Sequence, residues 1–303
     1  MVPHSFEYFA PTSVEEVFKL LKEHAGDAKV LAGGMSLIPL MKLRLASPGF
    51  VIDINRIRWL EYIRESIDGR ALLIGPLATH HDLESSPLVR KRLPLLSETA
   101  GSIGDPQVRN LGTIGGALAH SDPSGDWGAA MLAARGTVKV SGQSGERSIP
   151  IDDFLVDTFT TALRDDELIT QVSVPMPTES GSGGAYVKLE RKAGDFATVA
   201  VAAQISLEGR PDGSYCSYAG IGLTALGAKN LRANEAEKRL VGRKVTEETI
   251  AEASAAVAEE CSPVGDPLRG SAKYKRDMAG LFARRAIESA VARAKGDTRR
   301  KSR

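Results

Sequence analysis

The chain has 303 residues, which is longer than one average domain, so two or three domains are expected. Hydrophobic residues make up 42% of it and charged residues 25%, as in ordinary soluble globular proteins. Because 39 basic residues nearly balance 38 acidic ones, the formal charge is +1. This balance gives no reason to expect a nucleic-acid or membrane-surface partner.

The start of the chain, residues 1–11, has no basic region followed by a long apolar run, and no apolar stretch approaches the length of a membrane span. We therefore expect no signal peptide, no transmembrane segment and a cytoplasmic location. Only two cysteines occur, Cys216 and Cys261. An iron–sulfur cluster takes about four thiolates, so the chain cannot ligate one alone, and we expect both cysteines to be buried as small apolar side chains.

The first segment alternates helix and strand. Ser13 is a helix-capping residue type, and apolar residues recur after it at helical spacing until Gly26, which predicts a helix. Residues 29–32 form an expected short strand that runs directly into two glycines. A second helix is expected over residues 36–45 and a second strand over residues 50–54.

The middle segment mixes short strands, helices and glycine-rich turns. A strand is expected over residues 71–74, and Thr79 is a suitable cap for the helix after it. An apolar helical stretch covers residues 129–134. Residues 138–140 and 148–151 flank a glycine turn, which predicts a β-hairpin.

Prolines, serines and glycines over residues 175–184 form the clearest linker in the chain. Beyond it, alternating apolar residues predict strands over residues 199–207 and 214–224, paired as a second hairpin. The remainder is expected to be helical over residues 246–260 and 273–294. The basic tail from residue 295 is expected to be solvated or disordered.

A pair of glycines stands where the first segment turns from strand to helix, in the sequence Ala32, Gly33, Gly34, Met35 and Ser36. Adjacent glycines let the backbone approach a ligand closely, because they carry no Cβ. Ser36 offers a hydroxyl, and the free N–H groups of the following helix suit an anion. Short glycine motifs are weak signals, so a plain strand-to-helix turn explains this stretch equally well.

The same arrangement returns in the middle segment, in the sequence Thr113, Ile114, Gly115, Gly116 and Ala117. Two such loops from distant parts of the chain can clamp both phosphates of a dinucleotide. Neither has the glycine spacing of the common nucleotide fingerprints, so a dinucleotide would bind in a non-Rossmann way. Asp126 is suited either to accept hydrogen bonds from ribityl hydroxyls or to cap the helix after it. His120 is suited equally to contact a flavin or to brace the turn.

The two loops resemble the FAD pyrophosphate loops of the medium subunits of molybdenum-containing hydroxylases, the aerobic carbon monoxide dehydrogenase and xanthine dehydrogenase family. Further motifs similar to that family follow in the same order: Leu37-Ile38-Pro39, Asp105-Pro106-Gln107-Val108-Arg109-Asn110, Asp122-Pro123, Tyr186-x-Lys188-Leu189-x-Arg191-Lys192-x-Gly194-Asp195-Phe196-Ala197, and Tyr274-x-x-x-Met278-Ala279-Gly280. The similarity covers nearly the whole chain. Met35 and Ala117 depart from it, since the carbon monoxide enzymes usually carry a polar residue and a small amide residue there.

The resemblance implies an α+β fold in three parts. Residues 1–57 and 58–176 would be the two subdomains of an FAD-binding fold of the vanillyl-alcohol-oxidase (PCMH) type, and residues 177–303 a C-terminal α+β domain. It further implies that FAD is bound non-covalently by the two glycine loops. Three more residues are implied as cofactor contacts: Asp126 at the ribityl chain, Leu163 at the isoalloxazine, and Lys188. No catalytic residue and no metal ligand are expected in this chain.

The resemblance also implies an oxidoreductase subunit that relays electrons. A small subunit would deliver them from two 2Fe–2S clusters, a large molybdopterin subunit would oxidise the substrate, and an external acceptor would take the electrons from FAD. The complex would be a dimer of heterotrimers. The lack of cluster-forming cysteines agrees with this division. Two alternatives are a stand-alone flavin oxidase or reductase of the same fold and a flavin-free assembly subunit.

Overall fold

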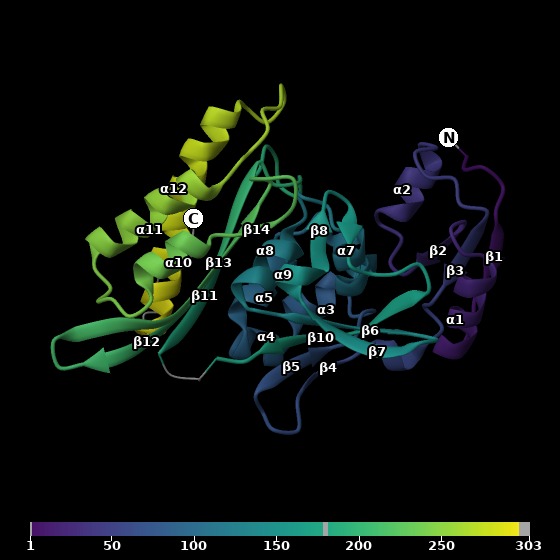
Figure 1. Cartoon of the computed structure of the whole chain (residues 1–303), viewed down its shortest axis with the longest axis horizontal. Helices are drawn as coiled ribbons and strands as arrows, with labels where there is room; N and C mark the ends of the chain where they lie inside the picture. The colour runs from purple at the N-terminus through teal and green to yellow at the C-terminus, as the bar shows by residue number, and fades with distance from the viewer. Residues whose placement is uncertain (1, 178–180, 297–303) are drawn as a thin grey trace.

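A computed structural model describes residues 2–177 and 181–296. In Figure 1 the chain runs from its N-terminal part on the right, through a central part, to its C-terminal sheet and helices on the left. The three main sheets use separate stretches of sequence: residues 7–53, 63–175 and 182–232. Across the described ranges, no helix is both long and apolar enough to cross a membrane.

The N-terminal part holds a small parallel sheet with the strand order β1 (Glu7–Phe9), β3 (Phe50–Asp53) and β2 (Ala28–Leu31). Helix α1 (Val14–Glu23) begins as predicted, because the Ser13 hydroxyl accepts a hydrogen bond from the Glu16 amide. Helix α2 is shorter than the expected 36–45 and covers only Leu37–Lys42. It ends there because Arg44 has a φ of 60°, which a right-handed helix does not contain.

The central part is built on an antiparallel sheet with the strand order β4 (Ile63–Glu65), β5 (Ala71–Ile74), β10 (Glu167–Pro175), β6 (Thr137–Gly142) and β7 (Gly145–Pro150). The predicted strand β5 and the β6–β7 hairpin are confirmed. A small hairpin, β8 (Leu155–Asp157) and β9 (Thr160–Thr161), stands apart from this sheet. Thr79 caps its helix as predicted, in a reciprocal pair of hydrogen bonds with Asp82.

Short helices pack around the central sheet: the 3-10 turn η1 (Arg58–Leu60) and helices α3 (His80–Ser85), α4 (Pro87–Arg92), α5 (Pro94–Gly101), α6 (Pro106–Leu111), α7 (Ile114–His120), α8 (Asp126–Ala133) and α9 (Ile151–Phe154). Helix α8 is buried along its whole length, including Trp127. The central part is therefore a sheet and a helical layer around one apolar core.

The C-terminal part is a four-stranded antiparallel sheet in the order β11 (Ser182–Leu189), β12 (Val199–Arg210), β13 (Gly213–Thr224) and β14 (Leu231–Arg232). Helices α10 (Asn234–Leu240), α11 (Glu247–Glu260) and α12 (Ala272–Ala294) cover one of its faces. The predicted hairpin and the two long helices are confirmed. The linker expected over residues 175–184 extends too far, because strand β11 already begins at Ser182, which pairs with Ser206. The predicted tail lies largely outside the described residues, since only 295 and 296 of it are described.

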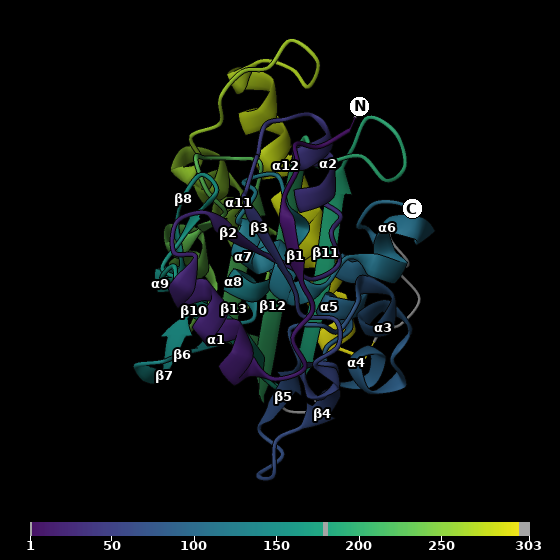
Figure 2. The same cartoon turned by 90° about the vertical axis from the view of Figure 1, so that its right-hand side faces the viewer.

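Helix α8 joins the central and C-terminal parts. In Figure 2 it lies against the face of strands β12 and β13 opposite to α12. Gly220 and Gly222 allow this approach, because a Cβ on either glycine would lie 1.9 Å from a backbone oxygen of α8, that of Ala133 or Ala129. One buried apolar cluster consequently includes side chains of both parts.

Both cysteines are buried and free, as predicted. Burial raises the pKa of the Cys216 thiol to about 11 and raises that of Cys261 as well. Thiols of this kind remain protonated at neutral pH and are unreactive.

Candidate functional site

The first glycine segment, residues 32–36, connects β2 to α2. Gly34 has a φ of +72°, a conformation that favours glycine. Asn55 fixes the start of the segment, because its Nδ2 donates a hydrogen bond to the Ala32 carbonyl at 2.9 Å. The backbone N–H groups of the next four residues, Gly33 to Ser36, have no hydrogen-bond acceptor among the described residues. Four successive donors are therefore free for a ligand.

The second glycine segment, residues 113–117, is the cap and first turn of helix α7 and not a loop as expected. The Thr113 hydroxyl starts the helix by accepting a hydrogen bond from the Gly116 amide at 3.1 Å. Gly115 is needed for packing, since a Cβ there would lie 2.4 Å from the Cβ of Pro76. Tertiary packing and the threonine cap thus offset the weak helix propensity of two adjacent glycines.

The two glycine segments lie against each other, although about 80 positions separate them in the sequence. A Cβ on Gly33 would lie 2.0 Å from the carbonyl oxygen of Leu111, which allows no side chain at this crossing. A Cβ on Gly116 would lie 3.8 Å from the Cβ of Ala32. Gly33 is therefore needed to let the chain just before the second segment approach, whereas a Cβ on Gly116 would make only an ordinary contact with Ala32.

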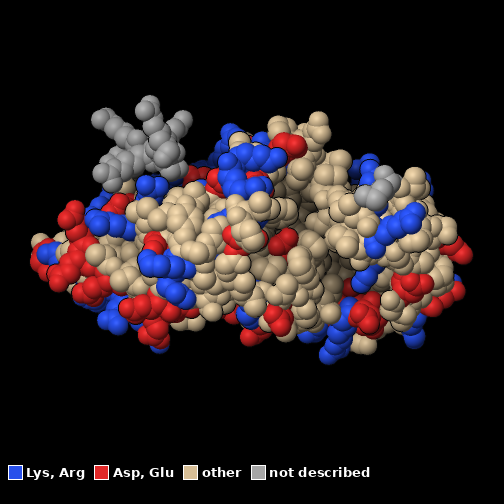
Figure 3. Space-filling model, turned by 90° about the horizontal axis from the view of Figure 1, so that it is seen from above, with Lys and Arg blue, Asp and Glu red and all other residues tan. Residues whose placement is uncertain are grey.

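A cavity of about 680 Å³ opens where the two segments meet. Seen from above, the surface is hollowed between the N-terminal part and the centre of the molecule, and the middle of this face carries few charged side chains (Figure 3). All five residues of the first segment line the cavity, as do Leu163 and four of the five residues of the second segment. The exception is Ile114, whose side chain is buried in the central core.

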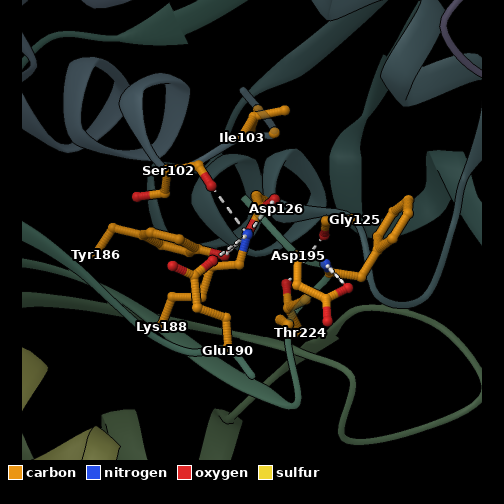
Figure 4. Close-up of polar contacts among 12 residues, drawn as sticks. Ser102, Ile103, Gly125, Asp126, Tyr186, Lys188, Glu190, Asp195 and Thr224 are labelled. Carbon is orange, nitrogen blue, oxygen red and sulfur yellow. Dashed lines mark hydrogen bonds and ion pairs between the residues drawn. The ribbon is translucent and has the colours of Figure 1, made fainter. Parts of the chain in front are cut away.

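Asp126 and Lys188 are absent from the cavity lining and pair with each other. Figure 4 shows the side chains of Tyr186 and Lys188 directed toward Asp126. The Tyr186 hydroxyl donates to Asp126 Oδ1 at 2.5 Å, and Lys188 Nζ lies 3.1 Å from the same oxygen. Asp126 does not cap α8, because Gly125 holds the N-cap position and Asp126 is the first helical residue. The capping alternative is therefore wrong.

The Asp126 carboxylate lies in a dry environment. Burial raises its pKa above the usual range, while the Lys188 ammonium and the Tyr186 hydroxyl act in the opposite direction. Lys188 Nζ also donates to the carbonyl oxygen of Ser102 at 3.0 Å. This network ties the start of α8 to strand β11 and to the end of α5.

Three histidines line the cavity, namely His24, His80 and His120. His80 is buried, and its Nδ1 accepts a hydrogen bond from the indole N–H of Trp127 at 3.1 Å. The His120 ring lies 5.0 Å from the ring of Phe159, which also lines the cavity next to the β8–β9 hairpin. Burial lowers the pKa of the His80 and His120 imidazoles.

Sequence reasoning missed several parts of the cavity wall, namely Pro76, His80, Gly112 and the residues of the β8–β9 hairpin. Nothing in the local sequence marks them, because they reach the cavity only through the tertiary fold. The His24 ring stacks with that of Phe50, with 3.7 Å between the ring centres, and also lines the cavity.

The cavity fits a dinucleotide such as FAD. Its volume lies within the roughly 300–1,000 Å³ of small-molecule sites. The four free amides of residues 33–36 suit a pyrophosphate, since backbone N–H groups of this kind form anion-binding concavities. Leu31, Phe159 and Leu163 provide apolar surface for ring systems.

Comparison with known proteins agrees with this chemistry. Residues 4–177 match the model of the FAD-binding domain in molybdopterin dehydrogenase, and residues 184–290 match the carbon monoxide dehydrogenase flavoprotein C-terminal domain. The chain belongs to this family. It is 44% identical to the carbon monoxide dehydrogenase medium chain of Hydrogenophaga pseudoflava, over 97% of this chain and 99% of that protein. It is 36% identical to the glyceraldehyde dehydrogenase medium chain of Sulfolobus acidocaldarius, over 95% and 99%.

Solved structures of the family share the fold. A chain of carbon monoxide dehydrogenase from H. pseudoflava, in a form lacking the Mo-pyranopterin moiety, superposes with a TM-score of 0.92 at 45% identity, covering 97% of this chain and 99% of that one. A chain of quinoline 2-oxidoreductase from Pseudomonas putida 86 gives a TM-score of 0.89 at 31% identity, covering 97% and 100%. The chain is thus the FAD-binding medium subunit of a molybdenum hydroxylase, and its α+β fold is the one predicted.

Within this family the chain is the flavoprotein component of an oxidoreductase. FAD supplies the electron-transfer chemistry, while the protein binds, orients and electrostatically tunes the cofactor. Within residues 2–177 and 181–296, no group of three or more His, Cys, Asp or Glu side chains is placed to hold a metal ion.

Proposed function

We propose that this chain holds FAD non-covalently in the cavity between residues 32–36 and 113–117 and relays electrons from the 2Fe–2S clusters of a small subunit to an external acceptor. The supporting observation is the run of four unpartnered amides facing the capped start of α7 across one cavity. These donors would hold the pyrophosphate, and the Thr113 and Ser36 hydroxyls lie beside them. Leu163 would pack against the isoalloxazine.

Asp126 and Lys188 remain proposed contacts of the flavin half of the cofactor. Helix α8 begins close to the end of α7, so its first residue is near the cavity although it does not line it. A carboxylate has about four lone-pair sites. Asp126 therefore retains acceptor capacity for a ribityl hydroxyl beyond its bonds to Tyr186 and Lys188.

The proposal places the substrate on another subunit. Relatives named for carbon monoxide and for glyceraldehyde are 44% and 36% identical to this chain over nearly their whole length. Sequence similarity of this extent between subunits of enzymes with unlike substrates is expected if the subunit does not bind the substrate. We propose that the complex is a cytoplasmic dimer of heterotrimers, each with a small iron–sulfur and a large molybdopterin subunit. The chain itself would comprise subdomains 1–57 and 58–176 and a C-terminal domain, 177–303.

Acid precipitation of the purified complex tests the proposed binding mode. All the flavin should appear in the supernatant and chromatograph as FAD, because hydrogen bonds and apolar contacts do not survive acid precipitation, whereas a covalent bond would. Yellow colour retained in the pellet, or FMN in the supernatant, would contradict non-covalent FAD binding. A colourless complex would favour the flavin-free assembly subunit.

A further inference from the structure

The side chain of His80 forms part of the cavity wall beside the second glycine segment. It is only 4% exposed and comes from the first turn of α3. The backbone N–H of His80 donates to the Gly112 carbonyl at 2.9 Å. Its Nε2 faces the same residue so closely that a Cβ on Gly112 would lie 2.8 Å away. The imidazole is therefore fixed next to the residue that precedes Thr113.

Trp127 determines which ring nitrogen of His80 carries the proton. The indole can only donate, so His80 Nδ1, 3.1 Å from it, must be the acceptor. A neutral imidazole that accepts at Nδ1 carries its hydrogen on Nε2. Trp127 is itself only 2% exposed, which holds this arrangement in place.

The Nε2–H group of His80 has no acceptor within the described part of the chain. This nitrogen is not among the fully buried polar atoms that lack a partner, so it is open to the cavity, where a ligand or water can accept its hydrogen bond. Since His80 lines the cavity next to both glycine segments, the missing acceptor belongs to whatever fills the cavity.

We propose that His80 is a further cofactor-binding residue, whose Nε2–H donates a hydrogen bond to a pyrophosphate oxygen of FAD. This inference rests on the proposed function, because it needs a dinucleotide in the cavity. His80 would thus recognise a ligand with an anionic oxygen beside the Gly112–Thr113 backbone.

Burial, together with the nearby Arg109 charge, lowers the pKa of His80 and keeps this donor neutral. The lowered pKa is about 4. Arg109, on α6, is paired with Glu84 of α3 at 2.9 Å, so the nearest cation already has a counter-ion. Helix α8 presents the uncharged Trp127. His80 therefore adds a directional hydrogen bond without adding a charge.

Two substitutions distinguish the roles of the two ring nitrogens of His80. His80→Asn places an amide oxygen near the Nδ1 position, where it can accept from Trp127, but it removes the Nε2 donor. His80→Gln places an amide N–H near the Nε2 position and retains that donor. His81→Asn is the matched control, because the neighbouring His81 is exposed.

The experiment uses the enzyme complex purified through a tag on this chain, stripped of flavin and titrated with FAD, with ³¹P NMR of the bound cofactor. We expect His80→Asn to weaken FAD binding about tenfold, and His80→Gln to weaken it by about threefold or less. One phosphate resonance should move toward that of free FAD in the Asn variant alone. The His81→Asn complex should match the wild type.

Unchanged affinity and phosphate resonances in His80→Asn would overturn the inference while leaving the proposed function intact. Equal losses in the Asn and Gln variants with unshifted phosphate resonances would also overturn it, because they would show a structural role only. Failure of the wild-type complex to bind FAD would overturn the proposed function and the inference together.

Discussion

The buried imidazole of His80 makes the stability of the chain depend on pH. Its pKa of about 4 in the folded chain lies below the usual 6.5, so the unfolded chain binds more protons between these values. The His80 contribution is therefore complete above pH 6.5 and is lost as the pH falls through 4. At pH 4 the loss should be of the order of 3 kcal/mol. In urea unfolding between pH 7 and 4, the unfolding free energy of His80→Gln should fall less steeply with decreasing pH than that of the wild type. Equal slopes for the two proteins would contradict the prediction.

The Asp126–Lys188 pair should behave as a buried ion pair, because the two side chains are 6% and 5% exposed. Removing one partner leaves the other charge buried and alone, so Asp126→Asn or Lys188→Met should each cost about 3–5 kcal/mol. The double variant should cost clearly less than the sum of the two. Denaturant titrations of the four proteins give the coupling free energy. Additive losses would show that the two groups do not depend on each other.

At the scale of elements, the first turn of α7 gives the cleanest test of the glycine segments. Gly116 is not at a positive φ, and a Cβ there would meet only Thr113 Oγ1 at 3.0 Å and the Ala32 Cβ at 3.8 Å. The branched side chain of Gly116→Val should therefore enter the space between the segments and remove most of the bound flavin, with little loss of thermal stability. Gly34→Val should remove the flavin and also lower the thermal stability, since Gly34 has a φ of +72°.

Gly209→Val is the matched control for these variants, because Gly209 is exposed near the end of β12 and a Cβ there meets nothing within 4 Å. The measurements are flavin absorbance per chain and the melting temperature. Full flavin occupancy in Gly116→Val would show that this turn does not face the cofactor.

The contact between α8 and β13 should be equally sensitive to an added side chain. Gly222→Val would push a Cβ to within 1.9 Å of the Ala129 carbonyl oxygen, which neither element can accommodate without moving. We expect a loss of about 3 kcal/mol in stability, the upper end of overpacking effects, whereas Gly209→Val should cost little. Calorimetry of both variants checks this, and equal melting temperatures would argue against tight packing between the central and C-terminal parts.

Local signals in the sequence predicted most elements correctly where neighbours along the chain control them. Ser13, Thr79 and Thr246 each cap a helix through a hydrogen bond to a nearby amide, and the β6–β7 hairpin has its turn residues in place. The predictions were wrong where contacts between residues distant in the sequence determine the local structure. Gly115 lies in a helix partly because it packs against the distant Pro76, which no local propensity reveals.

The same distinction applies to the candidate site. The two glycine segments were recognisable as short motifs, and the structure brings them together at one cavity. The pairing of Asp126 with Tyr186 and Lys188 could not be read from the sequence, since about 60 positions separate the partners. The position of His80 likewise depends on the packing of α3 against α8 through Trp127.

For the molecule as a whole, the cysteine content leads to a prediction about partnership. The chain contains two cysteines, both buried, so it cannot carry an iron–sulfur cluster by itself. Large apolar side chains nevertheless remain exposed on it, including Trp59 at 55%, Leu268 at 71% and Val264 at 77%. Permanent complexes bury roughly 2,000–5,000 Å² of fairly hydrophobic surface, which would cover such residues.

We therefore expect the tagged chain, isolated from its native host, to co-purify with a cysteine-rich small subunit and a large molybdopterin subunit. Alone, it should show no hydroxylase activity toward any substrate, because the proposed function places substrate oxidation on the large subunit, and electrons would reach the flavin only from a partner. Mixing it with both subunits should restore electron transfer to an external acceptor. A chain that elutes alone and oxidises an organic substrate with oxygen as sole acceptor would instead be a stand-alone oxidase of the same fold.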